Sequence, residues 1–137
     1  MKSIRVLSHT SDIRLLIKSN SRHELFRAGI LGLAKIISPA VREKKYTISK
    51  KIRVESLDLT TLFIDMLNEV LSLNHVNKCV FDDINSLEIF DERAVEIELN
   101  GYPVNKFIKD VKAVTYHEAE IRQSSLGILQ IVVILDI

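Results

Sequence analysis

Apolar residues recur along this chain with two different spacings, and the spacing changes from one segment to the next. Near the start, apolar and polar residues alternate over 3–9 and again over 12–18, which predicts two short β-strands. In the second of these strands the apolar side chains run from residue 13 to residue 17 at every other position. This alternation places Asp12 on the opposite, polar face.

A helix is predicted directly after these strands. Ser21 and Glu24 have the spacing of a capping box, in which the two residues satisfy free backbone N–H groups at a helix start. The apolar residues that follow predict a helix that ends before Pro39. Gly29 and Gly32 lie inside it, where each costs about 1 kcal/mol relative to Ala. We therefore expect this helix to pack closely against a neighbour.

A second helix is predicted by apolar residues that recur every three or four positions on one face. These residues are Leu59, Leu62, Phe63, Met66, Leu67, Val70 and Leu71. The opposite face carries Asp65, Asn68 and Glu69. These three are either a solvated helix face or a surface that recognises a basic partner.

The rest of the chain has the pattern of extended structure. Residues 42–55 are interpreted as an extended hairpin, and five strands are expected after the second helix, at 78–82, 86–90, 93–99, 110–121 and 127–136. The last is apolar on both faces, so we expect it to be central and covered twice. Because helices do not alternate with strands, the pattern predicts one α+β domain over residues 1–137. Its largely antiparallel β-sheet layers would pack with two main helices.

Composition narrows the class of protein. The chain has 137 residues, of which 47% are hydrophobic, so it can bury a sizeable core. Cys79 is the only cysteine and cannot form an internal disulfide, which indicates a reduced, intracellular protein. Its neighbours Val80 and Phe81 favour a small buried residue over an activated thiolate. No apolar stretch approaches the roughly 20 residues that span a bilayer, and the N-terminus lacks the features of a signal peptide. We expect a cytoplasmic protein without membrane contact.

Charge is divided unevenly along the chain. Residues 1–68 contain 13 basic and 6 acidic side chains, and residues 69–137 contain 6 basic and 12 acidic ones. The densest basic stretch consists of Arg42, Lys44, Lys45, Lys50, Lys51 and Arg53. It is interpreted either as a solvated edge whose lysines prevent aggregation or as a contact for nucleic acid or another partner.

The four glycines match no phosphate-binding loop, so nucleotide binding by such a loop is not expected. The first candidate site is instead a cluster of oxygen ligands for a metal ion. The chain as given stops on its last strand, which puts the side chain of Asp136 beside the main-chain carboxylate of Ile137. If Asp12 lies nearby, three carboxylates converge, and such a cluster favours Ca²⁺, Mg²⁺ or Mn²⁺. The alternative is that Asp12 is a turn residue and Asp136 a solvated strand end.

A histidine is the second candidate. In the expected strand 110–121, alternation places His117 on the same face as Val111 and Ile121. A histidine on such a face is either a hydrogen-bonded core residue or a group that transfers protons.

The order and spacing of these residues resemble those of the archease family over essentially the whole chain. The matching motifs are His9-Thr10-Ser11-Asp12-Ile13, Glu24-Leu25-Phe26, Asp65-Met66-Leu67-Asn68-Glu69-Val70-Leu71, Val111-Lys112-Ala113-Val114-Thr115-Tyr116-His117 and the closing Asp136-Ile137. The resemblance implies a metal-binding accessory protein, not itself a ligase, that activates an RtcB-type RNA ligase in tRNA splicing and RNA repair. It would promote guanylylation of the ligase and multiple turnover, and would meet RNA only through the ligase.

Carried over residue by residue, the family's metal site falls on Asp12, Asp136 and the terminal carboxylate of Ile137. The implied cofactor is a divalent cation, either Ca²⁺ or one of Mg²⁺ and Mn²⁺. His9, Lys112 and His117 would be supporting residues.

This chain also departs from the family pattern. It has Arg14 where the family usually has Gly and Met66 where the family often has Trp. Arg14 shares a strand face with Asp12, so it would partly neutralise the carboxylates. Two alternatives remain open. One is a metal-dependent phosphohydrolase with His117 as general acid or base. The other is an RNA-binding module that uses residues 42–53.

Overall fold

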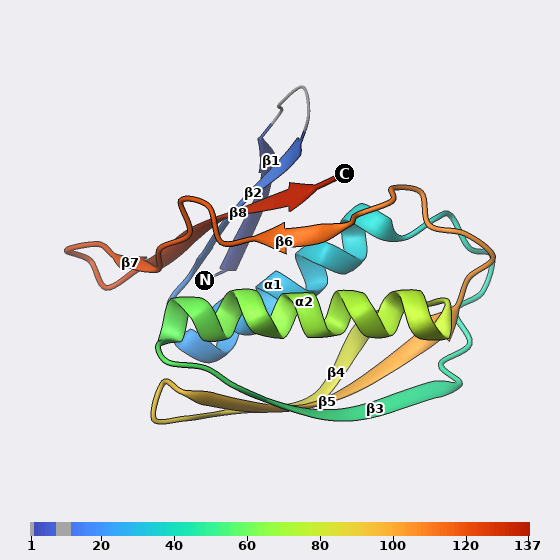
Figure 1. The fold of residues 1–137 in the computed structure, drawn as a ribbon, viewed down its shortest axis with the longest axis horizontal. Coiled ribbons are helices and arrows are strands. Elements are labelled where there is room, and N and C mark those ends of the chain that lie inside the picture. The colour runs from blue at the N-terminus through green and yellow to red at the C-terminus, as the bar shows by residue number, and fades with distance from the viewer. Residues whose placement is uncertain (1, 8–11) are drawn as a thin grey trace.

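Two helices and eight strands make up the computed structural model, which describes residues 2–7 and 12–137 (Figure 1). The helices are α1 (Arg22–Ile37) and α2 (Leu59–Asn77). The strands are β1 (Lys2–Leu7), β2 (Asp12–Ser19), β3 (Ile48–Glu55), β4 (Cys79–Phe90), β5 (Ala94–Pro103), β6 (Ala113–Thr115), β7 (Arg122–Gln123) and β8 (Leu129–Asp136).

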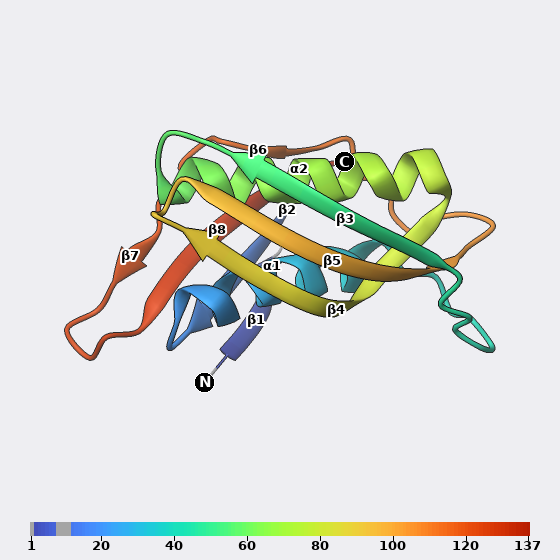
Figure 2. The same cartoon turned by 90° about the horizontal axis from the view of Figure 1, so that it is seen from below.

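The strands form two antiparallel sheets with both helices between them (Figures 1 and 2). One sheet has the order β1-β2-β8-β6, with β7 also paired to β8, and the other has the order β3-β5-β4. Helix α1 contacts β1 and β2 on one side and β4 on the other, and α2 contacts β6 and the three-stranded sheet. The expected α+β class with antiparallel layers is confirmed. So is the central position of the last strand, because β8 lies between β2 and β6. The expectation that it is covered on both faces is wrong, because both helices lie on one side of this sheet (Figure 1).

Both helices begin where local hydrogen bonding dictates. The Ser21 side chain accepts a hydrogen bond from the Glu24 amide at 3.2 Å, so the predicted cap of α1 is confirmed. Asp58 caps α2 by accepting from the Thr61 amide at 2.8 Å, and this bond holds the pKa of Asp58 below its ordinary value. No helix in the described parts of the chain is both long and apolar enough to cross a membrane.

The helices touch each other through a glycine, as the sequence predicts. A Cβ atom on Gly29 would lie 2.6 Å from the ring of Phe63, so only glycine permits this approach. Phe63 in turn meets Phe26 edge to face, with ring centroids 5.1 Å apart. Because a sheet covers each side of this helix layer, both helices bury far more than a single stripe of residues.

Three further expectations about strands are wrong. Residues 78–82 and 86–90 belong to one strand, β4, whose pairing with β5 continues through two irregularities that break the alternation. The expected strand over 110–121 contains only the three residues of β6, because a turn follows in which Glu118 has φ 57°. Residues 42–55 do not form a hairpin. Only β3 is extended there, and it pairs with the distant β5.

Candidate functional site

Asp12 and Asp136 lie directly opposite each other on neighbouring strands. Asp12 is the first residue of β2 and Asp136 the last of β8, and the antiparallel register makes them partners. Side chains in such a pair share one sheet face, with Cβ atoms about 4.5–5.5 Å apart. Three positions along the same register, Leu15 and Val133 form a pair that is buried in the core. Because side chains alternate between the two faces of a sheet, this odd spacing places the aspartates on the opposite, outer face. Ile137 follows Asp136 directly.

The chemistry of this strand end suits a hard cation. Like charges directly opposite each other in a sheet are destabilising, and carboxylate oxygens are the ligands that Ca²⁺ and Mg²⁺ prefer. The Asp12 side chain is 21% exposed, and Asp136 is exposed, so solvent reaches both. Within residues 2–7 and 12–137, no three Asp, Glu, His or Cys side chains converge as a metal site. Among the described side chains, the register therefore supplies two carboxylates at this strand end.

Arg14 lies on the same face as the aspartates, as its position in the strand predicts. Its Nε is 3.8 Å from Asp12 Oδ1, and its Nη1 is 3.6 Å from Glu118 Oε2. Both distances are those of ion pairs longer than a hydrogen bond. The guanidinium thus bridges a carboxylate of β2 and one from the turn after β6.

The three supporting residues have different surroundings. The Lys112 amide donates to the carbonyl oxygen of Asp136 at 2.7 Å, which fixes the backbone of this strand end. Of the two alternatives for His117, the core residue is wrong, because β6 ends at Thr115 and His117 lies 74% exposed in the following turn. Its Nε2 is 3.6 Å from Glu118 Oε1. His9 lies outside the described residues.

Asn68 holds β6 in place, a role that its interpretation as part of a solvated helix face missed. Its Nδ2 donates to the Val114 carbonyl at 2.8 Å, and its Oδ1 accepts from the Val114 amide at 2.9 Å. One amide side chain therefore satisfies both backbone groups of a buried strand residue. The available sequence signal was an Asn inside a helix, where that residue is unfavourable without such a partner.

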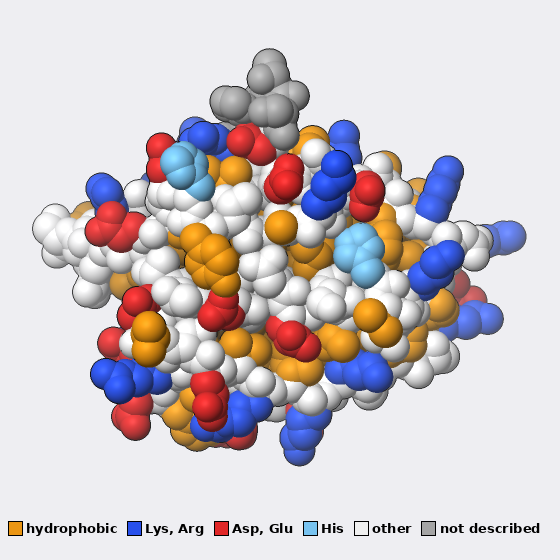
Figure 3. Space-filling model, viewed as in Figure 1, with side chains coloured by type: hydrophobic (Ala, Val, Ile, Leu, Met, Phe, Trp, Pro, Cys, Tyr) orange, Lys and Arg blue, Asp and Glu red, His pale blue; other side chains and the backbone are white. Residues whose placement is uncertain are grey.

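Asp65 also anchors the chain around β6. It accepts hydrogen bonds from the hydroxyl of Tyr116 and from Ser56 Oγ, the latter at 2.5 Å. The bond to Asp65 raises the pKa of Tyr116 above its ordinary value. Only Glu69 of the three polar residues is exposed. In Figure 3, which views this face, acidic side chains are spread over the centre, whereas Lys and Arg gather toward the right.

The last three residues of the basic stretch lie on β3 of the other sheet, and the first three lie in the segment that precedes this strand. Lys51 Nζ is 3.3 Å from Glu98, and Arg53 Nη1 is 2.6 Å from Glu96, both on the neighbouring strand β5. Because β3 is an edge strand, this geometry favours the solvated-edge interpretation. Ion pairing with β5 also leaves less positive charge for a phosphate backbone.

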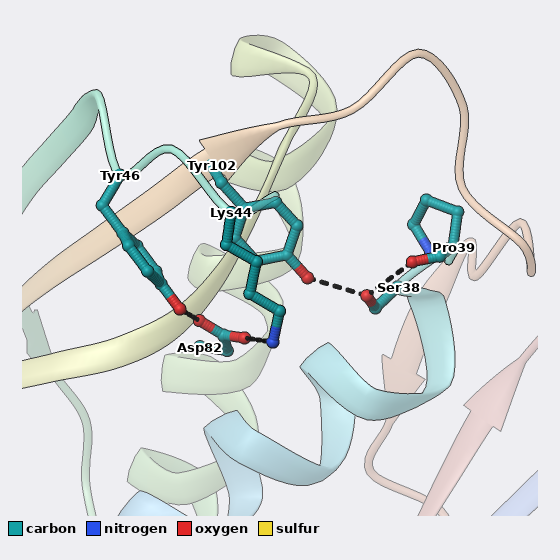
Figure 4. Close-up of polar contacts among 6 residues, drawn as sticks. All are labelled: Ser38, Pro39, Lys44, Tyr46, Asp82 and Tyr102. Carbon is teal, nitrogen blue, oxygen red and sulfur yellow. Dashed lines mark hydrogen bonds and ion pairs between the residues drawn. The ribbon is translucent and has the colours of Figure 1, made fainter. Parts of the chain in front are cut away.

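A polar cluster fastens the chain before β3 to β4 (Figure 4). Asp82 accepts hydrogen bonds from Lys44 Nζ at 2.7 Å and from the Tyr46 hydroxyl at 2.6 Å. The bond to Asp82 raises the pKa of Tyr46 to about 12. Beside them, the hydroxyls of Tyr102 and Ser38 lie 2.7 Å apart. These groups satisfy one another, so the cluster is structural.

Cys79 is fully buried, and burial raises the pKa of its thiol to about 11. A thiol with this pKa is protonated at neutral pH and is a poor nucleophile. The interpretation of Cys79 as a small buried residue is confirmed.

Comparison with known proteins identifies relatives over nearly the whole chain. Residues 5–137 match the family model described as the Archease protein family (MTH1598/TM1083). A protein named archease from Methanosarcina acetivorans is 30% identical over 133 residues, covering 92% of this chain and 90% of that protein. Another from Pyrococcus abyssi is 26% identical over 129 residues and covers 90% of each.

Two solved structures share the fold. The solution structure of protein 1598 from Methanobacterium thermoautotrophicum superposes with a TM-score of 0.78 at 20% identity, covering 98% of both chains. A crystal structure from Thermotoga maritima, described as an archease and possible chaperone, gives a TM-score of 0.68 at 19% identity, covering 96% of this chain and 94% of that one. At these identities the structures establish the arrangement of sheets and helices.

Proposed function

Because this chain belongs to the archease family, we propose that it is a non-catalytic accessory protein that activates an RtcB-type RNA ligase. It would act in the cytoplasm during tRNA splicing and RNA repair, promote ligase guanylylation and repeated turnover, and meet RNA only through the ligase. The description of the Thermotoga maritima relative as a possible chaperone agrees with an accessory role.

The observation that carries the proposal is the register that makes Asp12 and Asp136 direct partners. These two side chains and the carboxylate of Ile137 would hold a divalent cation, Ca²⁺, Mg²⁺ or Mn²⁺. When bound, such a cation supplies positive charge that phosphate oxygens of a ligase-bound nucleotide can share.

The remaining residues support this strand end. The Lys112 amide holds the backbone of Asp136, and Asn68 holds the neighbouring strand β6 against α2. The metal donors therefore rest on strands whose positions other parts of the fold determine, as a preorganised site requires.

Multiple-turnover RNA ligation tests the proposal. An RtcB-type ligase from the same source is supplied with GTP and a divalent cation, and it receives no addition, wild type, Asp12→Ala or Asp83→Ala. Asp83 is an exposed aspartate on β4, in the other sheet, and serves as the matched control. We expect stimulation by wild type and Asp83→Ala and its loss with a folded Asp12→Ala protein. Absence of stimulation by wild type would overturn the proposal.

A metal-dependent phosphohydrolase is the second candidate, favoured by one observation. His117 lies next to Glu118, the ion-pair partner of Arg14, and its side chain is exposed. A substrate in solution can therefore reach it. This function requires phosphate release from nucleotides by the isolated protein, and that release should disappear with His117→Ala. No release with Mg²⁺, Mn²⁺ or Ca²⁺ would exclude it.

A further inference from the structure

Arg14 makes two ion pairs of nearly equal length with carboxylates from different elements. Its Nε is 3.8 Å from Asp12 Oδ1, and its Nη1 is 3.6 Å from Glu118 Oε2. Both distances are longer than a hydrogen bond. Its Nε is buried and makes no hydrogen bond within the part of the chain that the structure describes. The guanidinium is therefore held between two anions rather than locked onto one of them.

Glu118 is a well-positioned alternative partner because α2 fastens its segment on both sides. The Tyr116 hydroxyl donates to Asp65, and the Ile121 amide donates to Thr60 Oγ1 at 3.0 Å. Between these anchors the Ala119 amide closes a turn onto the Tyr116 carbonyl at 3.1 Å. The Glu118 carboxylate consequently stays near the outer face of the sheet.

The same face has room for the arginine to move. A surface cavity of about 480 Å³ is lined by Arg14, Glu118, Arg122, Gln130 and Val132, among others. If the guanidinium moves toward Glu118, it enters this cavity and moves away from the strand end that carries Asp12.

We infer that Arg14 is a built-in competitor of the divalent cation, and that Glu118 is the positioning residue that receives it. Without a cation, Arg14 offsets the charge of the opposed aspartates. With a cation bound, Arg14 transfers to Glu118, because two positive charges within a few ångströms of the same carboxylates repel each other. The Arg14–Glu118 pair then sets the cation affinity. This inference rests on the proposed function, since it concerns the same carboxylates.

Calorimetric titration of the full chain with Mn²⁺ and with Ca²⁺ tests it. Arg14→Gln should tighten binding roughly fivefold, the scale of one unit charge at about 4 Å in water. Glu118→Gln should weaken cation binding, because Arg14 loses its ion pair with Glu118 and stays beside Asp12. In the Arg14→Gln background, Glu118→Gln should lose its effect, which a simple loss of negative charge would not do.

Matched controls come from the neighbouring ion pair, Arg122 with Glu120 at 2.9 Å. Arg122→Gln and Glu120→Gln make the same charge changes at this neighbouring pair and should leave cation affinity nearly unchanged. In a second readout, the Nε–H resonance of Arg14 should shift on Ca²⁺ addition to wild type and much less in Glu118→Gln.

The outcomes separate this inference from the proposed function. If wild type binds the cation but Arg14→Gln binds it equally, or if the two substitutions act additively, the inference is wrong and the metal site stands. If neither wild type nor folded Arg14→Gln binds a divalent cation, the metal site itself is wrong.

Discussion

The two sheets of this protein differ in how closely basic side chains approach their acids. On the three-stranded sheet each of three cations lies beside an acid at short range: Lys44 at 2.7 Å from Asp82, Lys51 at 3.3 Å from Glu98 and Arg53 at 2.6 Å from Glu96. Both sheets place two acids directly opposite each other, Glu88 and Glu96 in the three-stranded sheet and Asp12 and Asp136 in the five-stranded one. Arg53 lies 2.6 Å from Glu96, whereas Arg14 approaches Asp12 only to 3.8 Å.

On the proposed function, this difference separates charge with a structural role from charge that takes part in binding. Pairs of opposite charge across strands stabilise a sheet, whereas opposed carboxylates reduce its stability unless a cation joins them. Functional sites often retain such an unfavourable arrangement because a ligand relieves it. On the proposed function, the end of the five-stranded sheet is thus where we expect a cation to bind.

The largest effect is expected when an acid at the end of the five-stranded sheet is replaced by alanine, with an acid of the other sheet as the control. Asp136→Ala should reduce Mn²⁺ or Ca²⁺ binding below detection in calorimetry, because it removes one of the two opposed carboxylates. Asp136 is exposed, so the fold should survive, and without a cation the melting temperature should stay level or rise. Glu98→Ala removes an acid from the other sheet and should leave cation binding intact. Equal cation binding by wild type and Asp136→Ala would show that the opposed aspartates of the five-stranded sheet do not bind the cation.

The next largest effect is expected where α2 holds the edge of the five-stranded sheet. Asn68→Ala removes both hydrogen bonds to Val114 and should lower the free energy of unfolding by about 2 kcal/mol. Urea unfolding measures this loss. Glu69→Ala, its exposed neighbour, should change stability by less than about 0.5 kcal/mol. Similar values for the two variants would show that Asn68 does not anchor β6.

A smaller effect is expected from a short Gly-Ser extension after Ile137. Moving the terminal charge away should weaken cation binding by roughly tenfold, because one of three oxygen donors is lost. Ile137 is 39% exposed, so thermal unfolding should be nearly unchanged. Unaltered affinity for Ca²⁺ and Mn²⁺ would show that Asp12 and Asp136 bind the cation without the terminal carboxylate.

The smallest effect concerns the polar cluster beside the three-stranded sheet. The hydrogen bond to Asp82 raises the pKa of Tyr46 from 10.0 to about 12, which means that the folded protein favours the protonated hydroxyl. This contribution to stability is complete below pH 10 and is lost as the pH rises through 12. Urea unfolding at several pH values should show that the stability difference between wild type and Tyr46→Phe shrinks over this range. A constant difference would contradict the assignment.

The features that sequence predicted well depend on short distances along the chain. The cap of α1 joins Ser21 to Glu24, and the apolar face of α2 repeats every three or four residues, so both are visible without a fold. The alternation in β2 likewise predicts that Asp12 and Arg14 share a face. The central position of β8 follows from apolar residues on both of its sides.

The features that sequence missed depend on partners far away in the chain. The sequence predicts that Asn68 belongs either to a solvated face or to a surface for a basic partner, because its actual partner, Val114, comes from another element. Residues 42–55 were interpreted as a hairpin because nothing local reveals that β3 pairs with β5. The alternation of the sequence pattern continues past Thr115 and predicts that His117 lies on the same face as Val111. In the structure, β6 ends at Thr115 and a turn follows, so the alternation of side chains stops there.

By itself, the sequence determined where the helices begin, which faces are apolar, and that carboxylates occur near both ends of the chain. Only the tertiary structure decided that Asp12 and Asp136 oppose each other and that Arg14 lies between Asp12 and Glu118. The physical reason is that capping and periodicity act over a few residues. Strand register between distant segments is set by the packing of the whole core, because a shift by one residue would turn every buried side chain of β8 outward.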